Sequence, residues 1–362
     1  METDALPEAW SIIRDWLPDD LNERARADGF FQRLSGLNDA ELWLRLILMH
    51  VAGGLSLKQT ALRARELGLA QISSVALFKR LRRSHQWLQG LTRYLLTVQQ
   101  RKLGRFKWPY RYRLRIIDAT NIQEPGSTGT DWRLHYSIRL PELTCDHYEL
   151  TDDQGGEKLG RYVFAPEELV LVDRGYSHRA GVAHVMDAGA QVLVRWNPGL
   201  FPLQDAAGKP LQLLPRLRAL RTGQTGEWPV RFVWQQKTYD LRLCAVRKSE
   251  VAAKRALRRA QRKAQKNGTQ AQAEALELTN YVLVLTSEQT LPLAAVLELY
   301  RGRWQVELVF KRLKSLLDAG QLPKNDDASA LAWMQAKILT ALVVDRILLE
   351  GKFFSPWGFA LG

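Results

Sequence analysis

The sequence contains little cysteine and no long uncharged apolar run, and each shortage excludes a class of protein. Only Cys145 and Cys244 are present, and neither has a Cys or His ligand beside it. Two isolated cysteines support neither a disulfide framework nor a zinc site, so we expect two buried thiols. No stretch approaches the roughly 18 uncharged apolar residues that a membrane-spanning helix needs. The acidic start METDALPEAW lacks the basic and apolar segments of an export signal, so we expect a cytoplasmic location.

Acidic residues are also scarce relative to basic ones. The chain of 362 residues has 38 Asp and Glu against 52 Lys and Arg, a net charge of +14. Such an excess favours a polyanionic partner, because cations that bind phosphates release condensed counterions. Nucleic acid is therefore the first candidate partner. The 46% hydrophobic content is enough for packed cores, and the length allows two or three domains.

Residues 1–108 are predicted to form a helical DNA-binding domain, because apolar residues recur there at intervals of three and four. Within it, Ser56 would open one helix, Gly68 would break it, and Ser73 or Ser74 would cap a second. This order is typical of a helix-turn-helix. The second helix offers DNA a set of cations: Lys79, Arg80, Arg82 and Arg83. A basic helix face that only contacts water is the alternative.

The pattern changes to short β-rich runs over residues 109–196, which predicts an α/β fold with a mixed sheet. Residues 197–280 interrupt this pattern and look like an inserted subdomain. The strand YVLVLTS and a long helix follow, so residues 281–320 should return to the catalytic domain. Residues 321–362 should form a helical tail, which we expect to pack on that domain.

The inserted segment ends in an Ala-rich helix with a basic stripe. Lys254, Arg258, Arg262 and Lys266 are spaced by four, so a helix would align them on one side. Arg258 and Arg262 are therefore candidates for contact with a DNA backbone. A solvated helix face is again the alternative.

Two aspartates follow apolar runs that are predicted to be buried strands. Asp118 follows LRII, and Asp173 follows LVLV. Active sites in α/β sheets are built at strand ends, which makes both carboxylates candidate catalytic groups. Either one alone could instead be an ordinary turn-forming or capping aspartate.

A third acid comes from the helix predicted around YRGRWQVELVFKRLK. Tyr300, Arg303, Glu307 and Lys314 would fall within an arc of roughly 60° on an ideal helix. Apolar residues on the other side of the helix would anchor it to a core. An amphipathic helix without a special role also has a polar face, so the spacing alone does not decide between the two.

These four residues match without gaps the signature Y-x2-R-x3-E-x6-K of the bacterial DDE transposases of insertion sequences, in the IS-four group. The sequence is similar to the group's other two motifs as well, with IIDATNI around Asp118 and LVDRGY around Asp173. The resemblance covers residues of about 109–320. It implies a ribonuclease-H-like catalytic core with a β-rich insertion between the second and third acids.

The resemblance also implies the roles of the site residues. Asp118, Asp173 and Glu307 would be the catalytic, metal-binding acids, and three carboxylates suit two Mg²⁺ ions, with Mn²⁺ as a substitute. Tyr300, Arg303 and Lys314 would bind DNA phosphates. His135 and His178, close to the motifs, are expected to be structural rather than metal ligands.

The implied activity is cut-and-paste transposition. Double-stranded DNA, both the terminal inverted repeats and the target, would be bound by a homodimer in a synaptic complex within the nucleoid. The resemblance implies a hairpin intermediate, whose sharp bend favours an extruded base stacked on an aromatic ring. Trp228 and Trp234 are the candidates, although each could be a core tryptophan of the inserted sheet.

Two other functions remain open at the level of the sequence. One is a DNA-binding protein that has lost catalysis, against which the intact acids argue. The other is a hydrolase with paired carboxylates that acts on sugars or other small substrates, for which the net charge of +14 has no use.

Overall fold

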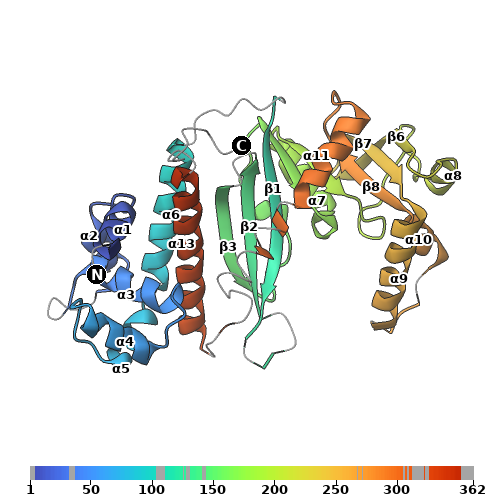
Figure 1. The fold of residues 1–362 in the computed structure, drawn as a ribbon. Helices are drawn as coiled ribbons and strands as arrows, with labels where there is room; N and C mark the ends of the chain where they lie inside the picture. The colour runs from blue at the N-terminus through green and yellow to red at the C-terminus, as the bar shows by residue number, and fades with distance from the viewer. Residues whose placement is uncertain are drawn as a thin grey trace.

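The computed structural model describes most of the chain, and the statements below refer to that part. The described residues are 5–31, 37–102, 111–124, 126–127, 131–140, 144–266, 268–270, 272–304, 306–307, 310–311, 322 and 326–351. They form a helical unit on the β3 side of a central sheet and a further group of helices on the other side of the sheet (Figure 1). The predicted mixed α/β class is confirmed.

The N-terminal helices follow their sequence signals closely. The Ser56 side chain accepts a hydrogen bond from Gln59 N, and the Gln59 side chain accepts from Ser56 N, so the predicted helix start has a complete capping box. Gly68 ends this helix with a positive φ of 65°, and Ser73 caps the next helix. The helices are α1 (Ala5–Arg14), α2 (Leu21–Ala27), α3 (Ala40–Val51), α4 (Leu57–Glu66), α5 (Ser74–Leu81) and α6 (His85–Lys102).

One sheet of eight strands runs through the described part of the chain, in the order β3-β2-β1-β4-β5-β8-β7-β6. β1, β4 and β5 are parallel to one another, whereas β2 is antiparallel to both β1 and β3. This five-strand arrangement is that of a ribonuclease-H-like core. The strands are β1 (Arg113–Ile122), β2 (Trp132–Leu140), β3 (Thr144–Asp152), β4 (Glu168–Val172), β5 (Gln191–Arg195), β6 (Thr225–Trp234), β7 (Lys237–Arg247) and β8 (Tyr281–Thr286).

The inserted segment does not build a separate sheet. Its hairpin of β6 and β7 joins the central sheet through antiparallel pairing of β7 with β8. β8 in turn pairs antiparallel with β5, so backbone hydrogen bonds run without interruption from the core into the insertion. The helices on this side of the molecule are α7 (Arg179–Asp187), α8 (Leu214–Arg218), α9 (Glu250–Lys266) and α10 (Ala273–Leu278).

The C-terminal helix α13 (Asp327–Gly351) lies alongside α6 (Figure 1). We expected the tail to pack on the catalytic domain, but α13 packs chiefly against α6, α3 and α5 of the N-terminal helical unit. A hydrogen bond from Tyr148 to Gln335 links it to β3. Residues Asp327–Ile347 are long and apolar enough to cross a membrane, but 72% of that window is buried inside the fold. Burial of an apolar helix in a core accounts for its composition.

The helix predicted to run through Tyr300 and Glu307 is interrupted. α11 (Leu293–Arg301) ends at Gly302, where a 3₁₀ turn, η3 (Gly302–Trp304), begins. Helical conformation resumes at Val306 and Glu307. The tighter turn changes the direction in which Arg303 and Trp304 project, so the ideal-helix arc did not describe this stretch. Two other 3₁₀ turns of the same length are η1 (Leu159–Arg161) and η2 (Arg174–Tyr176).

Candidate active site

The register of two parallel strands places the first two acids side by side. Ile117 of β1 is level with Val172 of β4, and this is the last pair in their parallel ladder. Asp118 is the next residue of β1, which continues to Ile122 and so does not end at this acid as expected, whereas Asp173 directly follows the end of β4. Adjacent parallel strands lie about 4.8 Å apart, so both carboxylates emerge at the same edge of the sheet.

Arg303 lies between the three predicted acids and contacts each of them. Its Nη1 is 3.3 Å from Asp118 Oδ2, its Nε is 3.9 Å from Asp173 Oδ1, and its Nη2 is 2.7 Å from Glu307 Oε1. The Tyr300 hydroxyl donates to Asp173 Oδ1 at 3.4 Å. Because one planar guanidinium reaches all three carboxylates, the acids converge within a few ångströms of a single point.

The acids differ in exposure. The side chain of Asp118 is 16% exposed, that of Asp173 38%, and that of Glu307 60%. Burial raises the pKa of Asp118 to about 7, although the hydrogen bond from Ala119 N and the charge of Arg303 oppose the shift. Asp118 is thus the carboxylate that gains most from a nearby cation.

The donor set fits a hard divalent cation in kind, because it consists of carboxylate oxygens at a sheet edge. Among the described residues, however, no three His, Cys, Asp or Glu side chains already form a metal cage. The three acids surround Arg303 instead. Glu307 is the exposed member, so a small change of its rotamer can alter the spacing of the oxygens.

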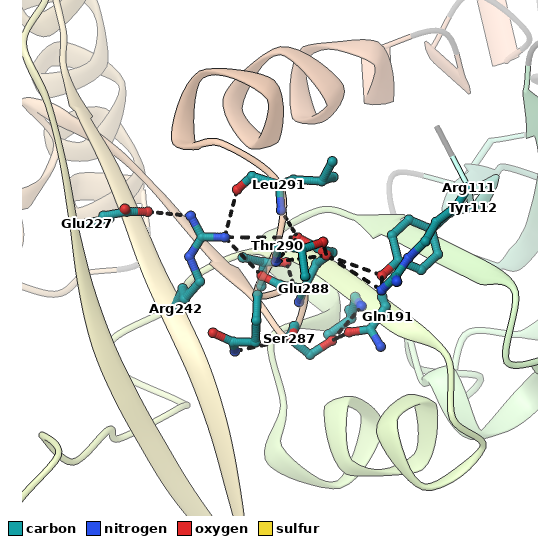
Figure 2. Close-up of polar contacts among 12 residues, drawn as sticks. Arg111, Tyr112, Gln191, Glu227, Arg242, Ser287, Glu288, Thr290 and Leu291 are labelled. Atoms are coloured by element: carbon teal, nitrogen blue, oxygen red, sulfur yellow. Dashed lines mark hydrogen bonds and ion pairs between the residues drawn. The ribbon is translucent and has the colours of Figure 1, made fainter. Parts of the chain in front are cut away.

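The N-terminal end of the helix that presents Tyr300 and Arg303 is fixed by a buried network (Figure 2). The Glu288 carboxylate accepts hydrogen bonds from the backbone N–H groups of Thr290, at 2.9 Å, and Leu291, at 2.6 Å. The Tyr112 hydroxyl donates to it at 3.2 Å. Arg242 of β7 donates to the carbonyl oxygens of Glu288 and Leu291. Strands β7 and β8, the segment before β1 and the start of α11 therefore meet at one carboxylate.

Two residues near the acids were missed by the sequence analysis. Glu157 is half-buried, and burial raises the pKa of its carboxyl, as does the charge of Asp173. A Cβ at Gly175 would lie 1.6 Å from Glu157 Oε2, so Glu157 packs directly against the LVDRGY turn. Trp304, beside Arg303, is 51% exposed, which is unusual for so large an apolar side chain. Glu157 belongs to no periodic pattern, whereas Trp304 could have been noticed beside the signature.

The predicted cations of α5 do not form one surface. Arg80 points into the fold, where it donates to Phe30 O at 2.9 Å and lies over the rings of Phe31 and Trp43. It is therefore unsuited to reading DNA. Lys79, Arg82 and Arg83 are exposed, and Arg82 forms an ion pair with Asp326.

The remaining candidates lie as follows. Arg258 and Arg262 are exposed on α9, and Lys314 lies outside the described residues. Trp228 and Trp234 are partly buried against the core of the insertion, and Arg179 lies over the ring of Trp234. The buried His135 ring contacts Thr151 Oγ1, and burial lowers its pKa to about 4.

Comparisons of the sequence with known proteins show the family. A model of the transposase DDE domain matches residues 149–343, a span that contains Asp173 and Glu307. The putative transposase InsL of insertion sequence element IS186A from Escherichia coli K12 is 34% identical over 363 residues, 96% of either chain. The transposase of insertion sequence element IS421 from Escherichia coli is 34% identical over 364 residues, again 96% of each chain. A piggyBac transposase structure, a synaptic complex with hairpin DNA, aligns with a TM-score of 0.49 at 9% identity, covering 96% of this chain and 76% of that one.

Proposed function

Since the chain belongs to the DDE transposases of bacterial insertion sequences, we propose that it excises and inserts its element by a cut-and-paste route, with Asp118, Asp173 and Glu307 as the catalytic acids. The observation that supports this assignment is the convergence of the three carboxylates on Arg303. A polypeptide that brings together three acids from distant segments has gathered the ligands that phosphoryl transfer needs.

The acids would hold two Mg²⁺ ions, for which Mn²⁺ would substitute. When bound, such ions lower the pKa of an attacking water or 3′-hydroxyl and stabilise the leaving oxygen. Asp118 and Asp173 are held by neighbouring strands, so they provide the fixed ligands. Glu307, beyond the 3₁₀ turn, provides the adjustable one.

During the reaction, Arg303 would exchange its carboxylate partners for a DNA phosphate. The carboxylate oxygens that contact Arg303 are the ones that would hold a divalent cation, so Arg303 would then be free to pair with another anion. The released guanidinium can then bind a DNA phosphate through two parallel hydrogen bonds. Tyr300, which donates to Asp173, and Lys314 would bind neighbouring phosphates.

The substrate would be double-stranded DNA, with the terminal inverted repeats bound by a homodimer before joining to the target. Lys79, Arg82 and Arg83 of the helical unit are the remaining candidates for contacts with the repeats. In a hairpin intermediate, Trp304 is better exposed for stacking on an extruded base than Trp228 or Trp234. Action on chromosomal DNA places the protein in the cytoplasm, at the nucleoid.

The assignment can be tested with a plasmid that contains the coding region and its flanking DNA. Asp118→Asn, Asp173→Asn and Glu307→Gln should each reduce Mg²⁺-dependent excision at least about a hundredfold, because even the loss of groups that only orient metal ligands costs up to that factor. DNA binding measured by gel shift should survive. Glu298→Gln, an exposed position on α11, is the matched control and should excise normally. Normal excision by any of the three acid variants would exclude that residue from catalysis.

A further inference from the structure

A cavity of about 800 Å³ lies between α9, the loop after β5 and the turn after Asp173. Its charged lining is entirely cationic among the described residues, and neither Asp nor Glu contributes to it. The cations come from four separate segments of the chain: Arg174, Arg195, Lys248, Arg255 and Arg259.

Two of these cations are close enough for the charge of one to affect the pKa of the other. Burial lowers the pKa of Lys248 to about 8, and the charge of Arg195 adds to the shift. Like charges gathered in a partly buried space are unfavourable by themselves, and an anion bound between them would offset the repulsion.

The cavity lies next to the acid site, because one of its lining residues is the neighbour of Asp173. Arg174 directly follows Asp173, and its guanidinium donates to Asn197 Oδ1 at 2.9 Å. Arg195 ends β5, which pairs with β4, the strand that ends directly before Asp173. A phosphate chain that reaches Asp173 can therefore pass Arg174 and Arg195 and continue to α9.

The α9 wall of the cavity is small and apolar apart from its two arginines. Ala252, Ala256 and Ala260 repeat every four residues, with Arg255 and Arg259 between them. Alanines permit close approach of a sugar-phosphate backbone and present no group that could read a base edge. Asn197, the amide in the lining, is already engaged by Arg174.

We propose that this cavity binds the sugar-phosphate backbone of the DNA strand next to the cleaved phosphate, without regard to sequence. The inference rests on the proposed function, since it assumes that DNA occupies the acid site. It also differs from the sequence-based prediction, which placed DNA contact on Arg258 and Arg262. Those two residues are on the same helix but do not line the cavity.

The two faces of α9 can be compared with double variants that remove the same charge. Binding of a labelled DNA duplex of arbitrary sequence is measured without metal over a range of salt concentrations. Arg255→Gln with Arg259→Gln should reduce the slope of log K against log salt by about 1.8, the value for two phosphate contacts. Arg258→Gln with Arg262→Gln should reduce it by much less. Circular dichroism of both variants verifies that α9 remains folded.

Equal slopes for the two double variants would overturn the proposal, because the effect would then be one of net charge. A larger loss from the Arg258 and Arg262 pair would overturn it in favour of the outer stripe. Binding that depends on duplex sequence in the unmodified protein but not in the cavity variant would also contradict it. If the unmodified protein binds no DNA, the proposed function fails as well, which separates that outcome from the others.

Discussion

Two long helices of opposite character, α13 and α9, lie on opposite sides of the central sheet (Figure 1). At the β3 end, α13 and α6 pack together, and α13 is apolar around most of its circumference (Figure 1). On the other side of the sheet, α9 is exposed along most of its length, and its basic residues cover one broad side, opposite a side rich in alanine. An apolar helix gains stability by burial, whereas an exposed basic helix adds little to it. The difference indicates that α13 contributes more than α9 to the free energy of folding.

The largest effect on stability is expected when a leucine is replaced by alanine in α13 and, for comparison, in α9. Leu339 of α13 is 1% exposed, so Leu339→Ala should lower the free energy of unfolding by about 2–5 kcal/mol. Leu257 of α9 is only half-buried, and Leu257→Ala should cost about 1 kcal/mol or less. Urea denaturation followed by circular dichroism measures both. Similar losses would show that the two ends contribute equally, contrary to our comparison.

A second substitution tests how much the buried carboxylate of Glu288, which joins β8 to the start of α11, contributes to the free energy of unfolding. Glu288→Gln should destabilise the protein by about 1–3 kcal/mol at neutral pH, because the buried backbone N–H groups before α11 lose part of their acceptor. Burial raises the pKa of Glu288, but hydrogen bonds from Thr290 and Leu291 outweigh it and leave the pKa lowered.

A lowered pKa gives a defined pH dependence. The stability contributed by Glu288 is present above its ordinary pKa and is lost as the pH falls through the lower value of the folded state. The difference between the variant and the unmodified protein should therefore shrink below about pH 4.5. Glu298→Gln provides the control, since Glu298 is exposed. A difference that stays constant down to low pH would exclude the ionised Glu288 as its cause.

The smallest effect is expected at the acid site itself, which lies between the two ends. The raised pKa of Asp118 means that its ionised form opposes folding at high pH. Asp118→Asn should therefore stabilise the protein by roughly 1–2 kcal/mol at pH 8. This figure already allows for the loss of the contact with Arg303. The gain should vanish as the pH falls from about 7 toward 4. Thermal unfolding at several pH values measures it, and destabilisation at pH 8 would contradict the assignment of Asp118 as a strained acid.

The sequence was sufficient for features that depend on local pattern. The apolar run before Asp173 predicted the end of β4, and the run before Asp118 predicted a buried strand, although β1 continues past Asp118 to Ile122. Hydrophobic periodicity with Ser56 and Gly68 predicted the helix and its limits. Signature spacing predicted that Tyr300, Arg303 and Glu307 belong together. Each of these signals is contained within a few consecutive residues.

Features that depend on distant contacts could not be predicted in this way. Nothing in the α5 sequence distinguishes Arg80, which is held inside by aromatic rings of α3 and the preceding segment, from the exposed Lys79. The position of Glu157 against Gly175 follows from the packing of a connecting segment on the β4 end. Likewise, the inner face of α9 could not be told from its outer face until the cavity was visible.

The unbroken hydrogen bonding from β5 through β8 to β7 has a mechanical consequence. A continuous sheet resists hinging, so the distance between the catalytic edge and the outlying basic helix is nearly constant. If DNA occupies both the acid site and the α9 cavity, as we propose, the duplex rather than the protein would have to bend. Sequences that kink easily, such as those with TA or CA steps, would be accommodated at lower energetic cost than stiff A-tracts.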